Sequence, residues 1–249
     1  MQTIRKFGCI PDPIDIRDVT YAASKPLGFS RTGDLRWNEL ILSVRDQGPA
    51  GTCTGYGSTG VCYASMRADK TFKTPAFHPS ELFPYFNGRA NKLEDTGASI
   101  RDVVKATATF GLAPYETWVY DVKNVCIKPP QRAYDQALKF KSIKYARVPQ
   151  TERDMVNVLA SGFAIVFGHT CRENFWKVGK DGMVPIPLGR EEGGHCEYIM
   201  GYDMNKQLFT VQNSWGLDRA DHGYEYFKFD HLLNPDHARD FWVIYEVSI

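Results

Sequence analysis

The sequence lacks the features of several protein classes. No apolar run approaches the roughly 20 residues that a membrane-spanning helix needs. Neither sign of charge dominates, because 30 Lys and Arg face 29 Asp and Glu and leave a formal net charge of +1. We therefore expect neither a nucleic-acid partner nor a membrane partner. The chain also has no internal repeat and no low-complexity segment.

A secretory signal is also missing, because no apolar stretch follows Arg5 and Lys6. This favours a cytoplasmic protein or one exported by a leaderless route. The six cysteines are widely spaced and form no pair such as Cys-x-x-Cys, so we expect no metal and no cofactor. Their even number permits disulfides, but without a secretory signal we expect free thiols. The cysteines are Cys9, Cys53, Cys62, Cys126, Cys171 and Cys196.

Length and composition suit an ordinary globular protein. The 249 residues are 43% apolar, enough for one large domain or two small ones. Residues 1–34 are rich in Pro, Asp and Gly and lack periodicity, so we expect an extended arm lying on a domain formed by residues 35–249. Roughly, residues 35–130 read as a helical half and residues 131–249 as a strand-rich half. The fold class is therefore α+β.

Start and stop signals place the helices. A helix is expected from Cys53 to Asp69, where three glycines suggest close packing of a buried helix. Ser99 with Asp102 resembles a capping box, and Gly111 ends the helix that follows. Thr151 with Asp154 repeats this start signal, and Gly162 closes that helix.

Short apolar runs between turn residues predict the strands. The expected strands span residues 163–167, 195–202, 207–211, 224–229 and 241–247. A cleft between a helical half and a strand-rich half is a natural place for a ligand.

One constellation carries chemistry. Cys53 stands at the expected start of a helix, where the helix dipole and free N–H groups favour a thiolate. Gln47 precedes it by six positions (53 − 47), and the glycines and proline between them suit a tight loop that returns Gln47 to Cys53. Its amide can then donate to an oxyanion together with the Cys53 N–H.

A base and its orienting group lie far along the chain. His195 opens one expected strand, and Asn213 follows the end of the next, so adjacent strands can bring them together. Trp215 can cover the bond between them. Each residue alone is a weak signal, because most buried cysteines are small hydrophobes. The order and the spacing of 142 positions from Cys53 to His195 (195 − 53) agree with the separation known for papain-like enzymes.

These motifs resemble the papain family of cysteine peptidases, and its bacterial-type members most. The resemblance spans nearly the whole chain and rests on Gln47, Gly51, Cys53, Gly193-Gly194, His195 and Asn213-Ser214-Trp215-Gly216, with Pro11-Asp12, Arg17-Asp18, residues 97–102 and Asp240-Phe241-Trp242. It implies a papain-like fold, in which a helical subdomain packs against a β-barrel-like subdomain with the active site between them.

The resemblance also implies a function. A cysteine endopeptidase would use Cys53 as nucleophile, His195 as base, Asn213 as its orienting group and Gln47 as oxyanion donor. The region matching Gly97 and Ala98 lies beside bound peptide in the family, so these two are candidate substrate-binding residues. We expect a peptide or protein substrate, no cofactor and a monomer.

Three departures affect the surroundings of the site. Ala50 stands where secreted relatives have a disulfide cysteine, Thr54 replaces a large aromatic residue, and Glu197 lies near His195 where small apolar residues are usual. A Glu near the imidazole could raise its pKa or offer it a different partner.

Two alternatives remain open at the level of sequence. The chain could be a catalytically degenerate binding or structural protein, or an acyl-transferase or deamidase on the same fold. The remaining histidines do not cluster, and we interpret them as surface or structural: His78, His169, His222, His231 and His237. Whether residues 1–34 inhibit the site, and which side chains the site prefers, also stay open.

Overall fold

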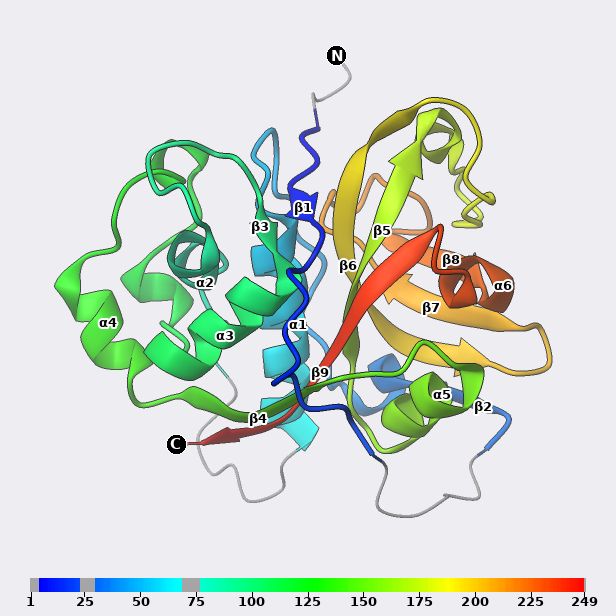
Figure 1. Cartoon of the computed structure of the whole chain (residues 1–249), viewed down its shortest axis with the longest axis horizontal. Coiled ribbons are helices and arrows are strands. Elements are labelled where there is room, and N and C mark those ends of the chain that lie inside the picture. The colour runs from blue at the N-terminus through cyan, green and yellow to red at the C-terminus, as the bar shows by residue number, and fades with distance from the viewer. Residues whose placement is uncertain (1–4, 23–29, 69–76, 249) are drawn as a thin grey trace.

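The computed structural model describes residues 5–22, 30–68 and 77–248. Four helices gather on one side of the molecule and a mixed set of strands on the other, and the N-terminal arm runs down the front between them (Figure 1). The four helices are α1 (Cys53–Ala68), α2 (Leu82–Gly88), α3 (Ile100–Phe110) and α4 (Gln131–Ala137).

Helix α1 is almost wholly buried, as its glycines predict. A Cβ added to Gly57 would lie 2.8 Å from the Cys196 sulfur, and one added to Gly55 would lie 2.5 Å from the Glu81 carbonyl oxygen. Both distances are too short for a side chain, so glycine lets the helix pack directly on its neighbours. The expected end at Asp69 lies outside the described residues.

The two predicted helix caps are confirmed. The Ser99 hydroxyl accepts the Asp102 N–H at 3.1 Å, and Gly111 ends α3 with φ of 85°. The Thr151 hydroxyl accepts the Asp154 N–H at 3.1 Å at the start of α5 (Glu152–Ala160).

A seven-stranded sheet forms the second half. Its order is β4-β9-β5-β6-β7-β8, and β2 pairs with β6 beside this path. No pairing joins the end strands β4 and β8 in the part of the chain described, so the sheet is open rather than a closed barrel. The strands are β2 (Thr32–Asp34), β4 (Lys141–Arg147), β5 (Ile165–Arg172), β6 (Glu191–Asp203), β7 (Leu208–Gln212), β8 (Tyr224–Lys228) and β9 (Ala238–Ser248).

All five predicted strands are found, with some limits extended. The run at residues 163–167 contributes to β5, which continues to Arg172, and the strand predicted from His195 begins four residues earlier at Glu191. The short helix α6 (Phe229–Leu233) follows β8 directly. Four 3-10 turns complete the described elements: Leu35–Asn38, Tyr115–Thr117, Val122–Asn124 and Glu173–Lys177.

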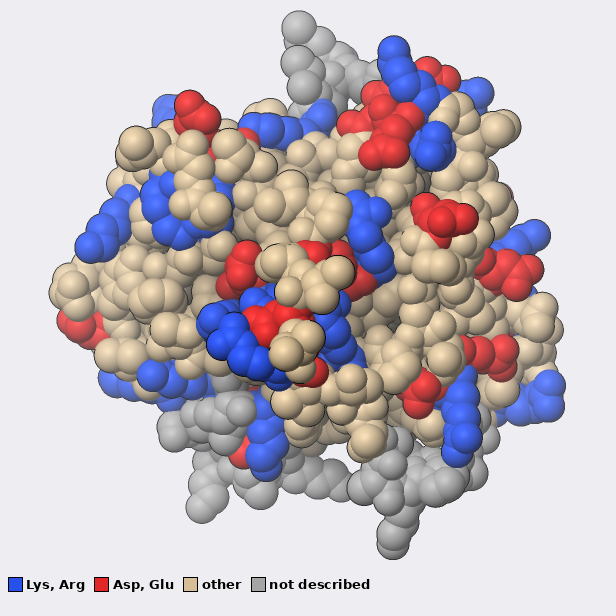
Figure 2. Space-filling model, viewed as in Figure 1, with Lys and Arg blue, Asp and Glu red and all other residues tan. Residues whose placement is uncertain are grey.

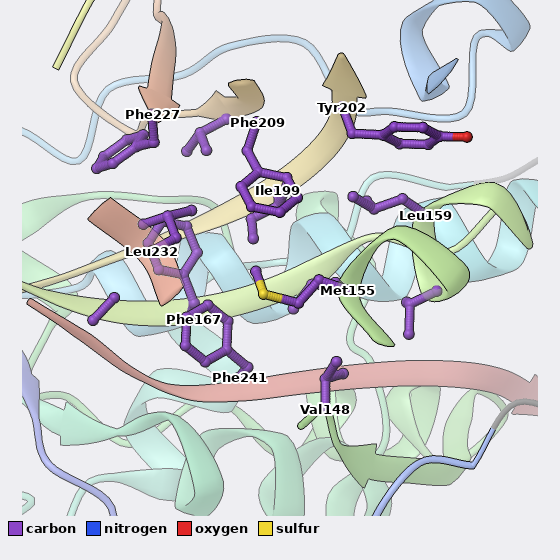
Figure 3. Close-up of a cluster of buried hydrophobic side chains, with 14 of the residues drawn as sticks. Val148, Met155, Leu159, Phe167, Ile199, Tyr202, Phe209, Phe227, Leu232 and Phe241 are labelled. Atoms are coloured by element: carbon purple, nitrogen blue, oxygen red, sulfur yellow. The ribbon is translucent and has the colours of Figure 1, made fainter. Parts of the chain in front are cut away.

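Two apolar cores flank the sheet. In one, Met155 and Leu159 of α5 pack towards the strands, and the rings of Phe167 and Phe241 stack with centroids 5.6 Å apart (Figure 3). The other lies between α1 and the opposite face of the sheet and includes Val61 and Trp242. Together they hold the N-terminus of α1 against the middle of β6.

The arm is anchored to both halves. β1 (Cys9–Ile10) pairs in parallel with β3 (Ala98–Ser99) on the helical side. β2 pairs antiparallel with β6 on the sheet side. The arm therefore crosses the line where the two halves meet.

An acidic cluster on the arm binds two arginines of the domain. Arg101 lies 2.5 Å from the Asp15 carboxylate and 2.8 Å from that of Asp18, and Arg147 lies 2.8 Å from Asp18. The buried carboxylate of Asp12 accepts bonds from the Arg101 N–H at 2.9 Å and the Trp242 indole at 2.7 Å. Figure 2 shows acidic and basic side chains together where the arm crosses the front of the molecule. We call this set the arm anchor.

The state of the cysteines matches the expectation from sequence. All six cysteines are free thiols, and five of them are buried. No helix within the described residues is long and apolar enough to cross a membrane.

Candidate active site

Cys53 is the first residue of α1 and is fully buried. Burial raises the pKa of its thiol above the ordinary value, and the nearby Cys9 adds to this shift. Backbone hydrogen bonds from Cys196, Gly8 and Thr54 act in the opposite direction. The bond from the Cys196 backbone places the Cys53 sulfur against β6, at the residue that follows His195 in the sequence.

His195 and Asn213 meet across two adjacent strands. The His195 Nε2 lies 3.1 Å from the Asn213 Oδ1, which is the pairing predicted from their positions on β6 and after β7. The other ring nitrogen, Nδ1, has no hydrogen-bond partner within the described residues. Burial lowers the pKa of His195 well below its ordinary value, and the neighbouring His169 contributes to this.

A buried ion pair holds Asn213 in place. Its Nδ2 donates to the Glu225 carboxylate at 3.0 Å, and Arg219 donates to the same oxygen at 2.6 Å. Burial and the charge of Glu197 raise the pKa of Glu225 to about 8, while Arg219 opposes the shift. The amide of Asn213 is thereby fixed with its oxygen towards the imidazole.

Trp215 covers the His195 ring, as expected from sequence. The two ring centroids are 4.7 Å apart, and Trp215 is 3% exposed. Trp176 stacks on Trp215 at 5.3 Å and extends the apolar cover. These rings keep water from the bond between His195 and Asn213, which strengthens it.

Gln47 joins the loop before α1 to the segment after β7. Its backbone N–H donates to the Ser214 carbonyl oxygen at 2.8 Å, and its side-chain oxygen accepts the Ser214 hydroxyl at 2.5 Å. Its Nε2 donates to the Ala50 carbonyl oxygen at 2.7 Å and reaches the Lys6 carbonyl oxygen at 3.3 Å. The amide donor therefore already meets a backbone carbonyl of a chain lying in the cleft.

That chain is the arm itself. Gly8 of the arm lies between Gly51, before α1, and Ala98 on β3. The Gly8 carbonyl oxygen accepts the Ala98 N–H at 2.9 Å, and a Cβ added to Gly8 would lie 1.9 Å from the Gly51 carbonyl oxygen. Gly97, with φ of 83°, faces the Gly8 carbonyl so closely that an added Cβ would be 2.5 Å away. Gly97 and Ala98 thus line the arm as the resemblance implies for a bound peptide.

Phe7 seals the site from the arm side. Its ring lies 6.0 Å from that of His195, 5.8 Å from Trp215 and 5.4 Å from Trp176. Arg5 adds an ion pair with Asp46 and donates to the Trp215 carbonyl oxygen at 3.0 Å. With these contacts in place, Cys53 and His195 have no exposed surface.

Several residues of the site were not identified from sequence. Phe7 and Trp176 carried no motif, and Glu225 lies in the strand expected at residues 224–229, where nothing singled it out. His169, interpreted as surface or structural, is buried on β5 directly opposite His195 in the register. The alternation of side chains along β5 and β6 would have indicated that His169 faces His195 only if the pairing register of the two strands had been known.

Comparison with known proteins decides the family. Residues 29–232 match the family described as papain family cysteine protease. The chain belongs to the papain family. This chain is also 37% identical over 276 residues to an uncharacterized peptidase C1-like protein of Acanthamoeba polyphaga mimivirus. The alignment covers 98% of this chain and 88% of that relative.

Solved structures of the papain family resemble it as well. Xylellain, a cysteine protease from Xylella fastidiosa, is 31% identical with a TM-score of 0.85 over 98% of this chain and 97% of that one. Bromelain from Ananas comosus, solved with the E64 inhibitor, is 21% identical with a TM-score of 0.67 over 86% of this chain and 98% of that one, a likeness of fold alone. The papain-like α+β fold is thereby confirmed, and the protein is a cysteine peptidase.

Proposed function

We propose that this papain-family protein is an endopeptidase that cleaves peptide bonds through a Cys53-His195-Asn213 site and an acyl-enzyme. The observation that carries the proposal is the 3.1 Å bond between His195 Nε2 and Asn213, which leaves the imidazole Nδ1 without a hydrogen-bond partner among the described residues. In this orientation one ring nitrogen is fixed and the other is available for the thiol proton.

The steps follow from the positions of the groups. The Cys53 sulfur gives its proton to His195 Nδ1 and bonds to the substrate carbonyl carbon. The oxyanion accepts hydrogen bonds from the Cys53 N–H and the Gln47 amide. His195 then protonates the leaving amine, which breaks the C–N bond and leaves a thioester. Water, deprotonated by His195, releases the acid and restores the thiol.

Binding of substrate would use the surface that the arm now occupies. Gly97 and Ala98 offer a main-chain edge to the arm, and the Gln47 amide reaches the Lys6 carbonyl oxygen. An extended peptide can make the same kinds of bonds through its backbone, which requires no particular side chain. This supports a peptide or protein as the substrate.

We further infer that the docked arm keeps the enzyme latent. The arm turns the Gly8 N–H towards the thiol, rather than a carbonyl carbon that could be attacked. Its Lys6 carbonyl also engages the proposed oxyanion donor. Burial stabilises the neutral thiol and the neutral imidazole, whereas catalysis needs the thiolate and the imidazolium. The arm must therefore leave before substrate enters.

The proposal is tested with a peptide electrophile and a set of unlabelled peptides. We expect the electrophile to modify Cys53 alone among the six thiols, and internal peptide bonds to be cut in the wild type but not in Cys53→Ala. The variant Cys126→Ala, which removes a partly exposed thiol, is the matched control. Equal labelling of several thiols, with no cleavage after the arm is displaced, would support a degenerate binding protein instead.

The same assay separates hydrolysis from acyl transfer. Products formed with and without an added amine acceptor are compared by mass spectrometry. A hydrolase gives mainly the free acid in both cases. Predominant formation of the amide product, or loss of ammonia from Gln without cleavage, would favour a transferase or a deamidase.

A further inference from the structure

A buried carboxyl group lies behind the catalytic imidazole. Glu197 follows His195 by two residues on β6, so both side chains leave the strand on the same face. The Glu197 Oε1 is 3.3 Å from His195 Nε2 and 3.5 Å from His169 Nε2. The side chain has no exposed surface, and neither oxygen has a hydrogen-bond partner within the described chain.

The cation that acts on Glu197 is already paired with another group. The positive charge of Arg219 acts on Glu197, but its guanidinium already binds the Glu225 carboxylate at 2.6 Å and the Phe175 carbonyl oxygen at 3.0 Å. The titratable and charged groups of the described residues that face Glu197 or its histidine partners are His195 and Cys196 on β6, His169 and Cys171 on β5, Glu225 on β8, His231 on α6, Arg239 on β9, Arg219 before β8 and Arg5 on the arm.

An isolated carboxylate in such a place is costly. Burial favours the protonated acid, and it raises the pKa of Glu197 to about 8 against the opposing influence of Arg219 and of the neighbouring Glu225. A cation 3.3 Å away would act in the same direction as Arg219 and favour the carboxylate. The His195 imidazole lies at that distance and gains a positive charge during the proposed reaction.

Asn213 cannot supply this charge. Its amide is neutral, and its Oδ1 also accepts the Ser214 N–H at 2.6 Å. Asn213 therefore orients the ring, and the anions that can stabilise the imidazolium are the Cys53 thiolate and a carboxylate near Nε2. Glu197 is placed on the side of the ring away from Nδ1, where it does not compete with the thiol for the transferred proton.

We propose that Glu197 is a positioning residue that supplies the buried counter-charge for His195 when the imidazole takes the proton of Cys53. The proton moves from the sulfur to Nδ1, and Glu197, which burial keeps protonated while the arm is docked, releases its own proton to the water that enters when the arm leaves. The carboxylate stabilises the cation through Nε2, so imidazolium formation and ionisation of Glu197 favour each other. This role rests on the proposed function, because it deepens the action of the same base.

The test is Glu197→Gln, which keeps the shape and removes the charge. It is measured in the full-length chain carrying Gly8→Val, a change expected to displace the arm. The pH dependence of kcat/KM is recorded with a fluorogenic peptide, and ¹⁵N shifts of the His195 ring are recorded across the same pH range. We expect the pH at which His195 loses its proton to fall by about one unit, a tenfold change in that equilibrium constant. The alkaline limb of kcat/KM should fall with it.

The control variant is Glu191→Gln, the same substitution at an exposed position at the start of the same strand. It should change neither the pH dependence of kcat/KM nor that of the His195 ¹⁵N shifts. Glu197→Asp keeps the charge, so the pH at which His195 loses its proton should lie between those of the parent and Glu197→Gln. It serves as a second variant if Glu197→Gln folds poorly. Unchanged His195 titration in both Glu197 variants, with normal thermal unfolding, would overturn the proposal. A shifted titration without peptide cleavage in the parent would overturn the proposed endopeptidase and leave the role of Glu197 intact.

Discussion

Single atoms decide whether the arm fits the cleft. Gly8 has a hydrogen where any other residue would place a carbon 1.9 Å from the Gly51 carbonyl oxygen. The obstacle is backbone, which cannot rotate away as a side chain can. The docked arm therefore depends on glycine at this position through close contact alone.

Replacing Gly8 should displace the arm. In Gly8→Val we expect the rate at which iodoacetamide alkylates Cys53 at pH 7 to rise at least tenfold, because the site regains water and the thiolate becomes accessible. Peptide cleavage should rise with it. The measurement is mass spectrometry of the alkylated protein over time.

Ile14→Val is the control, since Ile14 lies on the same arm with 97% of its surface exposed. It should alkylate at the wild-type rate. An unchanged rate in Gly8→Val, with unaltered unfolding temperature, would contradict a latent docked state.

At the scale of elements, the arm is held by charge as well as by fit. Arg101 at the start of α3 binds the carboxylates of Asp15 and Asp18, and these side chains are only 9–13% exposed. Solvent weakens ion pairs of this kind, but two carboxylates on one guanidinium form a network that holds better than an isolated pair. The arm anchor is therefore a second determinant of docking, far from the thiol.

Breaking the arm anchor should also activate the enzyme. We expect Arg101→Gln to increase the initial rate of peptide cleavage about tenfold, because losing about 1.4 kcal/mol of docking free energy raises the open population by that factor. The wild type should show a smaller rise when salt is increased, since screening weakens the same pairs.

Arg132→Gln, at an exposed position on α4, is the matched control and should leave the rate unchanged. Equal rates for the wild type and Arg101→Gln at every salt concentration would show that the anchor does not govern docking.

Sequence patterns predicted elements that carry a start signal or an apolar run between turns, and missed α2, which buries Leu82 and Phe83 without either signal. The strands around His195 and Asn213 stood out as apolar runs, and the caps of α3 and α5 were confirmed. β4 was missed because it lies at the edge of the sheet and carries Lys141, Lys144 and Arg147, which interrupt any apolar alternation. β1 escaped notice because its two residues gain their strand geometry only by pairing with Ala98 and Ser99.

The site divides in the same way. Cys53, His195, Asn213 and Gln47 have a recognisable order along the chain, so they could be proposed without a structure. His169 and Glu225 could not, because their places depend on the strand register that brings β5 and β8 around β6. The position of the arm was also beyond reach, since nothing local in residues 5–10 encodes the surface they contact.

At the scale of the whole molecule, buried histidines set the response to acid. Burial lowers the pKa of His78 to about 4, and that of His169 and His231 to about 3, from the ordinary 6.5. The unfolded chain therefore binds more protons than the folded chain once the pH falls below about 6.5, and these groups make unfolding easier on acidification. Glu197 and Glu225 act oppositely, because their raised pKa values of about 8 withdraw stability as the pH rises from 4.5.

A substitution at His231 tests whether a buried neutral histidine makes unfolding easier in acid. It is 1% exposed, and neither ring nitrogen has a hydrogen-bond partner in the described part of the protein. We expect His231→Phe to be at least as stable as the wild type at pH 7.5 and to gain on it below pH 6.5, by up to about 1.4 kcal/mol per pH unit. Urea unfolding at several pH values measures this difference.

The control is His222→Gln, at an exposed position before β8. Its stability should follow the wild type across the whole pH range. A constant difference between His231→Phe and the wild type from pH 7.5 to pH 4 would mean that His231 is not a neutral histidine in the fold.

The route of the arm has one more consequence, which concerns concentration. Because the blocking segment and the site belong to one chain, their encounter is intramolecular, and dilution cannot separate them. Ile14 and Ile16 lie between the cleft segment and β2 and are 97% and 99% exposed. A single cut there would turn the same segment into a free peptide, whose hold on the cleft then falls as the solution is diluted. After such a cut, the fraction of blocked enzyme would depend on the protein concentration, whereas in the intact chain it does not.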